Sequence, residues 1–134
     1  MNFRIFGQTY SLKKEELKKV AKAAFSVLGK KEGDIELKFV SPHEIKRLNS
    51  VYRNMDEVTD VLSFIIEPTP LIGQIFICYT KMKGQAKEVG ITIENEAKKL
   101  IIHGICHLYG LDHETDAEEK NMKKLERKIG EKVV

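Results

Sequence analysis

Three of the chain's four histidines lie within residues 103–113, and their spacing predicts a metal site. His103 and His107 are four residues apart, so on an α-helix of about 3.6 residues per turn both imidazoles leave the same face. Gly110 is the residue type most often found just past a helix end, because glycine adopts a positive φ without a steric penalty. We therefore expect the chain to turn there and to bring His113 back to the same ion.

The donor set indicates a catalytic site and not a structural one. Zinc held by three imidazoles keeps a fourth position open for water, whereas structural zinc sites are usually closed by cysteine. The chain has only 2 cysteines, Cys78 and Cys106, both in apolar surroundings. Cys106 lies about 60° around the predicted helix from His103 and about 100° from His107, so we expect a small buried side chain and not a ligand. One zinc ion held by His103, His107 and His113 is the resulting prediction.

The motif around these histidines separates two kinds of zinc hydrolase. The spacing H-x3-H-x2-G-x2-H is also that of metzincin proteases, in which a glutamate follows the first histidine and acts as general base. Gly104 occupies that position here and cannot move a proton. The longer pattern H-G-x-x-H-L-x-G-x-D-H, from His103 to His113, resembles the YbeY family of bacterial endoribonucleases that act in ribosomal RNA maturation.

A second segment is similar to the other signature of that family. It consists of Leu48-Asn49, Tyr52-Arg53, Asp56 and Thr59-Asp60-Val61-Leu62-Ser63-Phe64. Gln74, after Leu71-Ile72-Gly73, stands where the family usually has an aspartate, a departure that leaves the predicted ligands unchanged. The resemblance spans roughly residues 35–129, which is most of the chain.

The resemblance implies a fold and an activity. The fold is a small sheet, mostly parallel with one antiparallel edge, flanked by helices, with the metal ligands on a zincin-like central helix. The activity is that of a zinc-dependent, single-strand-specific endoribonuclease in rRNA processing and ribosome maturation. The implied partners are single-stranded RNA, chiefly rRNA, and ribosomal particles, with no DNA.

Hydrolysis of a phosphodiester needs an activated water and a positive charge beside the phosphate. Zinc lowers the pKa of a bound water towards about 7 and polarises a phosphoryl oxygen. We expect Arg53 to act with the ligand His107 as a catalytic residue, because a guanidinium matches two phosphate oxygens and keeps its charge at neutral pH. A structural salt bridge from Arg53 to a carboxylate is the alternative.

Several roles stay open at this level. The candidates for the general base are Asp56, Asp60 and Glu114, and a zinc-bound hydroxide could act without any base. The attacking group is either water or the ribose 2′-hydroxyl. Asp112 could orient a ligand imidazole or cap the helix end. His43 is expected to be an exposed surface residue, and the sequence shows no stacking platform of aromatic residues interleaved with basic ones.

Two other functions compete with the nuclease. The first is a metzincin-like peptidase or another zinc hydrolase, against which Gly104 argues. The second is a non-catalytic ribosome assembly factor in which the zinc only stabilises the fold.

The length indicates one domain over residues 1–134 that needs no disulfides, and the order of the predicted strands and helices indicates the α+β class with a mixed sheet. The cysteine pattern, the lack of a signal-like apolar core in the first residues and the lack of an apolar run near 18 residues predict a cytoplasmic protein without a membrane segment. Residues 1–54 carry 12 Lys and Arg against 6 Asp and Glu, a balance of 12 − 6 = +6, within a net charge of +3. Such a basic half can follow phosphates or can simply be a solvated surface.

Hydrophobic periodicity predicts the order strand, helix, strand, helix, strand, strand, helix, helix, helix. The strands are predicted at residues 2–6, 35–39, 61–66 and 75–79. The helices are predicted from the caps Ser11, Ser41, Thr92 and Thr115 and over the weaker stretch 80–89, with ends or interruptions at Gly29, Gly84 and Gly130. Because residues 61–66 are almost continuously apolar, we expect them to form a buried central strand. By analogy with zinc hydrolases that bind substrate along an edge strand, we expect residues 75–79 to form an edge lining the cleft.

Overall fold

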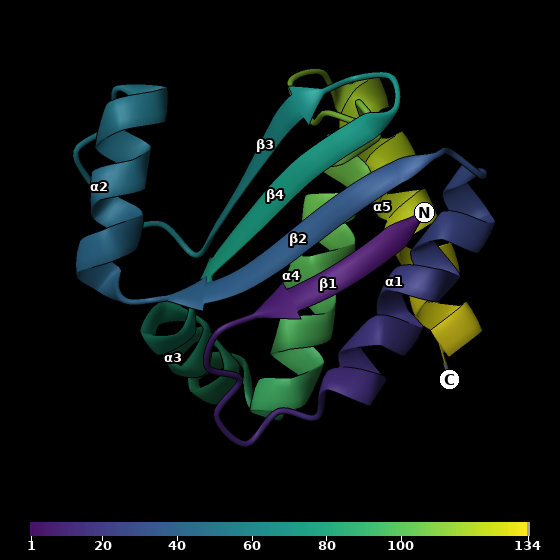
Figure 1. The fold of residues 1–134 in the computed structure, drawn as a ribbon. Coiled ribbons are helices and arrows are strands. Elements are labelled where there is room, and N and C mark those ends of the chain that lie inside the picture. The colour runs from purple at the N-terminus through teal and green to yellow at the C-terminus, as the bar shows by residue number, and fades with distance from the viewer. Residues whose placement is uncertain (134) are drawn as a thin grey trace.

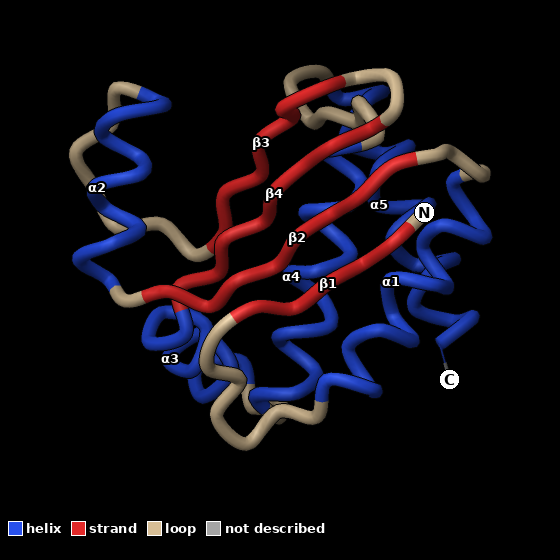
Figure 2. Tube along the Cα trace, in the orientation of Figure 1, coloured by secondary structure: helices blue, strands red, loops and turns tan. Residues whose placement is uncertain are grey.

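The computed structural model describes residues 1–133 and has the predicted order of elements (Figures 1 and 2). The strands are β1 (Asn2–Phe6), β2 (Gly33–Val40), β3 (Val61–Glu67) and β4 (Leu71–Cys78). The helices are α1 (Lys14–Leu28), α2 (Pro42–Arg53), α3 (Tyr79–Val89), α4 (Ile93–Leu108) and α5 (Asp116–Val133).

The strands form one mixed sheet in the order β1-β2-β4-β3. β1 pairs with β2 and β2 pairs with β4 in parallel, whereas β3 pairs with β4 antiparallel. The predicted α+β class, with a mostly parallel sheet and one antiparallel edge, is confirmed. Two placements within the sheet were wrong, because β3 is the edge strand and β4 lies inside the sheet between β2 and β3.

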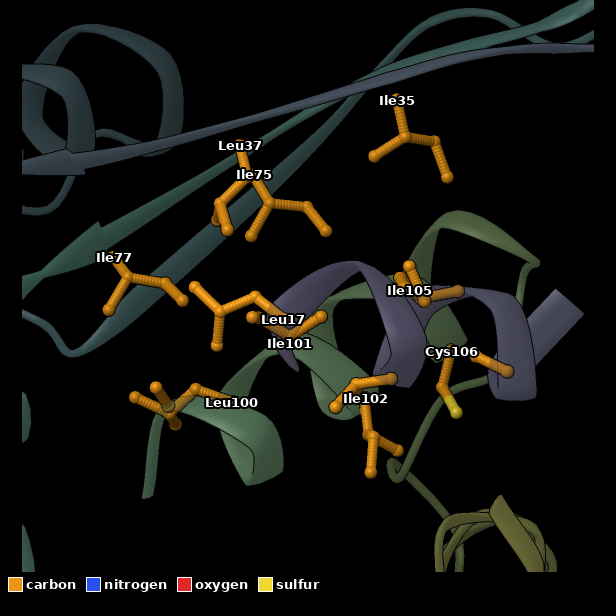
Figure 3. Packing of buried hydrophobic residues seen from close by; sticks show 14 of the residues in the cluster. Leu17, Ile35, Leu37, Ile75, Ile77, Leu100, Ile101, Ile102, Ile105 and Cys106 are labelled. Atoms are coloured by element: carbon orange, nitrogen blue, oxygen red, sulfur yellow. The ribbon is translucent and has the colours of Figure 1, made fainter. Parts of the chain in front are cut away.

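Helices α1 and α4 pack on one face of the sheet, and α5 packs on these two helices (Figure 1). Ile35, Leu37, Ile75 and Ile77 point from β2 and β4 towards α4 and α1, as Figure 3 shows. All four are fully buried, and they pack in one cluster with residues of the helices such as Ile101. This core holds α4 against the sheet and so determines where its histidines lie.

A smaller cluster joins α2 to one end of the opposite face. Ile45 of α2 packs with Val40, Leu62 and Cys78 at the ends of three strands. In Figure 1, α2 stands beside β3 and does not cross in front of β1 or β2. Much of this sheet face is therefore uncovered by helices of residues 1–133.

The helix boundaries follow most of the predicted signals. Ser41 Oγ accepts a hydrogen bond from the backbone N–H of Glu44 at 3.1 Å, and Thr92 Oγ1 accepts from that of Asn95 at 3.0 Å. Thr115 Oγ1 accepts from the backbone N–H of Glu118 at 3.1 Å, at the start of α5.

Three signals were wrong. Ser11 is not the cap of α1, which begins at Lys14 without a side-chain cap, since the chain still turns through residues 10 and 11. Gly84 does not interrupt α3, and Gly130 does not end α5, because an exposed or half-buried glycine lowers helix stability by only about 1 kcal/mol. Among residues 1–133, no helix combines the length and the apolar character needed to cross a bilayer.

Candidate metal centre

Helix α4 carries His103 and His107 on the side that faces a cleft, while its other side is packed into the core. Ile101, Ile105 and Cys106 are all fully buried (Figure 3). Burial, reinforced by the charge of Glu126, raises the pKa of the Cys106 thiol to about 12. The thiol therefore stays protonated at neutral pH, and Cys106 is the small buried residue that the sequence predicted.

The chain leaves α4 through a Schellman turn, which returns it towards the helix face. Gly110 has a φ of +86°, the backbone N–H of Gly110 donates to the carbonyl of His107 at 3.0 Å, and that of Leu111 donates to the carbonyl of Cys106 at 3.0 Å. Asp112 Oδ1 then accepts a hydrogen bond from the backbone N–H of His113 at 2.8 Å. This turn, closed by Asp112, places the third histidine beside the first two.

The three imidazoles converge as their spacing predicted. His103, His107 and His113 each offer one nitrogen, and these three atoms lie within 4.8 Å of one another. The Nε2 atoms of His103 and His107 are 3.1 Å apart. Nitrogens bound tetrahedrally to one zinc ion at about 2.0–2.1 Å would be roughly 3.3–3.4 Å apart, so the donor set fits a single ion.

The ring of His103 is oriented by a second contact. His103 Nδ1 lies 3.0 Å from Glu126 Oε2 on α5, so a proton on Nδ1 donates to this carboxylate and leaves the Nε2 lone pair facing His107. Burial, and then the nearby His103 and His113, lower the pKa of His107, which favours the neutral form that binds a metal.

The histidines open into a cleft of about 780 Å³ between α4, β3 and the segment after α2. Its lining includes the three histidines, Arg53, Ser63 and Phe64. The main-chain edge of β3 therefore forms one wall of the cleft, a position that the sequence analysis had given to residues 75–79.

Arg53 lies at the end of α2 and reaches over β3. One guanidinium N–H donates to the carbonyl oxygen of Ser63 at 2.6 Å, and the guanidinium carbon lies 5.2 Å from the centre of the Phe64 ring. The side chain is exposed at the rim of the cleft. Its partners are a main-chain carbonyl and an aromatic ring, in place of the carboxylate that a structural salt bridge would need.

The three candidate bases differ in their surroundings. Asp56 is exposed, lies 4.0 Å from Lys46 Nζ, and is not among the residues that line the cleft. Asp60 and Glu114 line it, but Asp60 Oδ1 already accepts the backbone N–H of Val61 at 2.8 Å.

His43 and Gln74 both lie away from the metal centre. His43 is exposed in the first turn of α2 and outside the cleft lining, as expected. Gln74 lies on the uncovered sheet face, where its Nε2 donates to Glu36 Oε1 at 3.4 Å.

Gly104 is required where α4 approaches the sheet. A Cβ atom at this position would lie 3.1 Å from Ser63 Oγ and 3.1 Å from two atoms of Ile75. The Gly104 carbonyl also accepts a hydrogen bond from Ser63 Oγ at 3.2 Å. A side chain here would run into β3 and β4 and not towards the histidines, so the glutamate of a metzincin protease has no place in this site.

Sequence reasoning missed Glu126, the carboxylate partner of His103. A signal was available, because Glu126 follows Met122 by four positions and precedes Ile129 by three, and both of these are buried on α5. A charged residue beside a buried stripe needs a polar partner. The position of α5 relative to α4, however, could not be inferred from the sequence.

A mixed sheet packed on a helix that bears two histidines, with a third histidine in the following turn, defines a class of metal-dependent hydrolase. The family profile described as "Endoribonuclease YbeY" matches residues 4–134. The chain therefore belongs to the YbeY endoribonuclease family, a metal-dependent hydrolase family, as the resemblance indicated.

Individual relatives support membership of this family. A protein of Limosilactobacillus reuteri named Endoribonuclease YbeY is 38% identical over 151 residues, covering 96% of this chain and 95% of its own length. An Aquifex aeolicus protein of the same name is 37% identical over 123 residues, covering 88% and 82%. The solution structure of a Thermotoga maritima protein superposes with a TM-score of 0.67 at 31% identity, covering 99% of this chain and 89% of that one.

Proposed function

We propose that His103, His107 and His113 hold one zinc ion, and that the protein hydrolyses phosphodiester bonds in single-stranded rRNA during ribosome maturation. The observation that carries this proposal is the convergence of three imidazole nitrogens within 4.8 Å in the cleft that also contains Arg53. A site of this kind combines a metal position with a fixed positive charge, and phosphodiester cleavage needs both.

The division of work follows from the contacts. His103, His107 and His113 would hold a divalent ion, which would supply Lewis acidity and lower the pKa of a water towards about 7. Glu126 holds His103 in the tautomer that presents Nε2. Arg53 uses part of its five-donor guanidinium on the Ser63 carbonyl, and the remaining N–H groups bind oxygens of the scissile phosphate as its charge increases.

Glu114 is our candidate for the proton acceptor. It lines the cleft and follows His113 directly in the sequence. Asp60 is occupied by the Val61 backbone N–H, and Asp56 lies outside the lining. Glu114 therefore takes the proton from the attacking oxygen in this proposal.

The test compares His107→Ala with His43→Ala, since His43 is an exposed histidine outside the cleft. We expect His107→Ala to lose both the bound zinc, measured by elemental analysis, and cleavage of a single-stranded RNA. His43→Ala should retain both, and chelation followed by zinc addition should abolish and restore cleavage in the wild type. Full cleavage by a zinc-free protein would contradict the proposal.

A further inference from the structure

The sheet has one face that the helices of residues 1–133 leave largely open, and aromatic and basic side chains lie on it. Figure 1 shows this face towards the viewer, with α1, α4 and α5 behind it. In the strand register, Phe6, Lys38, Phe76 and Leu62 are aligned in one row across β1, β2, β4 and β3. Phe6 is 44% exposed, Lys38 is exposed and Phe76 is half-buried, whereas Leu62 at the β3 end is buried, so the row is accessible from β1 to β4.

Three rings on this side form a continuous aromatic strip, composed of Tyr52, Phe64 and Phe76. The ring centres of Tyr52 and Phe64 are 5.3 Å apart, and those of Phe64 and Phe76 are 5.9 Å apart. Tyr52 is 66% exposed at the end of α2, and the two phenylalanines are half-buried. A tyrosine this exposed contributes little to the core, which leaves its ring face available to a ligand.

The aromatic strip begins at the metal cleft. Phe64 and Arg53 both line the cleft, and Arg53 lies over the Phe64 ring. Phe64 points to the open face, because it is in register with Gln74, whereas its neighbour Ser63 bonds to α4 on the other side. A bound single strand that leaves the cleft over the edge of β3 therefore contacts Phe64 first and then Tyr52 or Phe76.

Positive charge accompanies the rings. Lys38 is next to Phe76 in the register of β2 and β4, and Arg53 lies at the other end of the strip. Lys38 Nζ is 3.9 Å from Glu44 Oε2, a long and exposed contact that costs little to exchange for a phosphate. The neighbouring row contains Arg4 and Glu36 beside Gln74, and Arg4 is paired with Asp34 at 3.8 Å, so Lys38 is the basic residue aligned with Phe76.

We infer that the aromatic strip of Tyr52, Phe64 and Phe76 stacks the unpaired bases that flank the phosphodiester in the metal cleft, while Lys38 binds a backbone phosphate. Ring faces with nearby cations on an open sheet are the means by which proteins hold single strands, because the bases of a duplex are not free to stack on them. This inference rests on the proposed function, and it explains a preference for single strands by the shape of the surface.

The test measures RNA binding separately from cleavage. Metal-stripped protein is titrated into a fluorescein-labelled single-stranded RNA, and the dissociation constant is determined by anisotropy. We expect Tyr52→Ala to weaken binding about 5-fold or more, and Tyr52→Trp to preserve it, because stacking needs a ring and not a hydroxyl group. The control is Tyr10→Ala, which removes a tyrosine that is 51% exposed and stacks on Tyr79 outside the strip.

Salt dependence tests the charge. Lys38→Ala should lower the slope of log K against log salt concentration by about 0.7, the value for one phosphate contact on a single strand. A double-stranded RNA of the same sequence should bind no more weakly to Tyr52→Ala than to the wild type. Circular dichroism of each variant verifies that the fold is unchanged.

The inference and the proposed function can fail separately. If the zinc-loaded protein cleaves RNA while Tyr52→Ala binds and cleaves like the wild type, the strip is refuted and the nuclease stands. If the wild type binds RNA through Tyr52 but never cleaves it, the nuclease is refuted and the strip stands. If Tyr52→Ala changes the oligomeric state measured by sedimentation but leaves RNA binding unchanged, the strip is a contact between copies of the protein. The inference is then overturned.

Discussion

His103 uses its two ring nitrogens for two different tasks. Nε2 faces His107 at 3.1 Å, while Nδ1 lies 3.0 Å from the Glu126 carboxylate. A carboxylate on the far nitrogen orients the ring and makes the near nitrogen a better donor. We therefore expect Glu126 to affect metal affinity without being a ligand.

We predict that Glu126→Ala weakens zinc binding by about 10- to 100-fold and that Glu126→Gln, which keeps an acceptor oxygen, weakens it less. Competition with a chromophoric chelator measures the affinity. Glu131→Ala is the control, since Glu131 is an exposed carboxylate of the same helix. Equal affinities for Glu126→Ala and Glu131→Ala would show that the contact with His103 has no effect on the site.

At the residue scale, the convergence of the three histidines could be predicted from the sequence because they lie close together in the chain. Helical spacing and one glycine place His103, His107 and His113, and all lie within residues 103–113. The partners that come from elsewhere could not be assigned. Glu126 belongs to another helix, and the contact of Arg53 with Ser63 depends on how α2 stands relative to β3.

At the scale of elements, the contact between α4 and the sheet depends on Gly104. We predict that Gly104→Ala destabilises the protein by about 1 kcal/mol, since overpacking against the buried Ile75 costs about 1–3 kcal/mol and the better helix propensity of alanine returns up to about 1 kcal/mol. Urea unfolding measures the difference.

Gly84→Ala is the matched control within α3. A Cβ atom there would meet nothing within 4 Å, and the position is exposed. This variant should gain up to about 1 kcal/mol from helix propensity alone. If both variants were stabilised, the close approach of α4 to β4 would not restrict residue 104.

The exchange of roles between β3 and β4 shows where pattern reasoning stops. An almost unbroken apolar run predicted that residues 61–66 form a central strand, yet Ile65 and Ile66 are 51% and 53% exposed on the edge strand. Hydrophobic periodicity indicates which residues are apolar, but it does not indicate the order in which the strands pair in the sheet. In the order β1-β2-β4-β3, Ile75 and Ile77 of the inner strand β4 are fully buried in the core cluster that includes residues of α4.

At the scale of the molecule, the core is independent of the metal centre. The buried residues of the sheet, α1, α4 and α5 form one cluster, whereas the histidines are half-buried or exposed at its border. We predict that chelated protein keeps its far-ultraviolet circular dichroism spectrum. Zinc at about 100 times its dissociation constant should add ~2.7 kcal/mol and raise Tm by roughly 10 °C.

The same measurement addresses the assembly-factor alternative, in which zinc only stabilises the fold. Unfolding of the chelated protein at room temperature, together with intact RNA in the presence of zinc, would support that alternative. A cleavage rate that rises in proportion to zinc occupancy, in a protein that stays folded throughout, would exclude it.

The aromatic strip is a property of the whole fold. Its rings come from α2, β3 and β4, and they are twelve residues apart in sequence, so no local pattern marks them. The sequence analysis found no stacking platform for that reason. Alternation within β3 and β4 shows which residues share a face, but only the pairing of the two strands brings Phe64 beside Phe76.

The Arg53 side chain also has a consequence for solubility. β3 has one strand neighbour, and an unprotected outer strand with exposed isoleucines can recruit another polypeptide by backbone pairing. By donating to the Ser63 carbonyl, Arg53 places a cation across that border and obstructs such recruitment. A variant that lacks Arg53 would expose the edge of β3 and would tend to self-associate. Light scattering would therefore have to show that the variant is monodisperse before a loss of activity is attributed to catalysis.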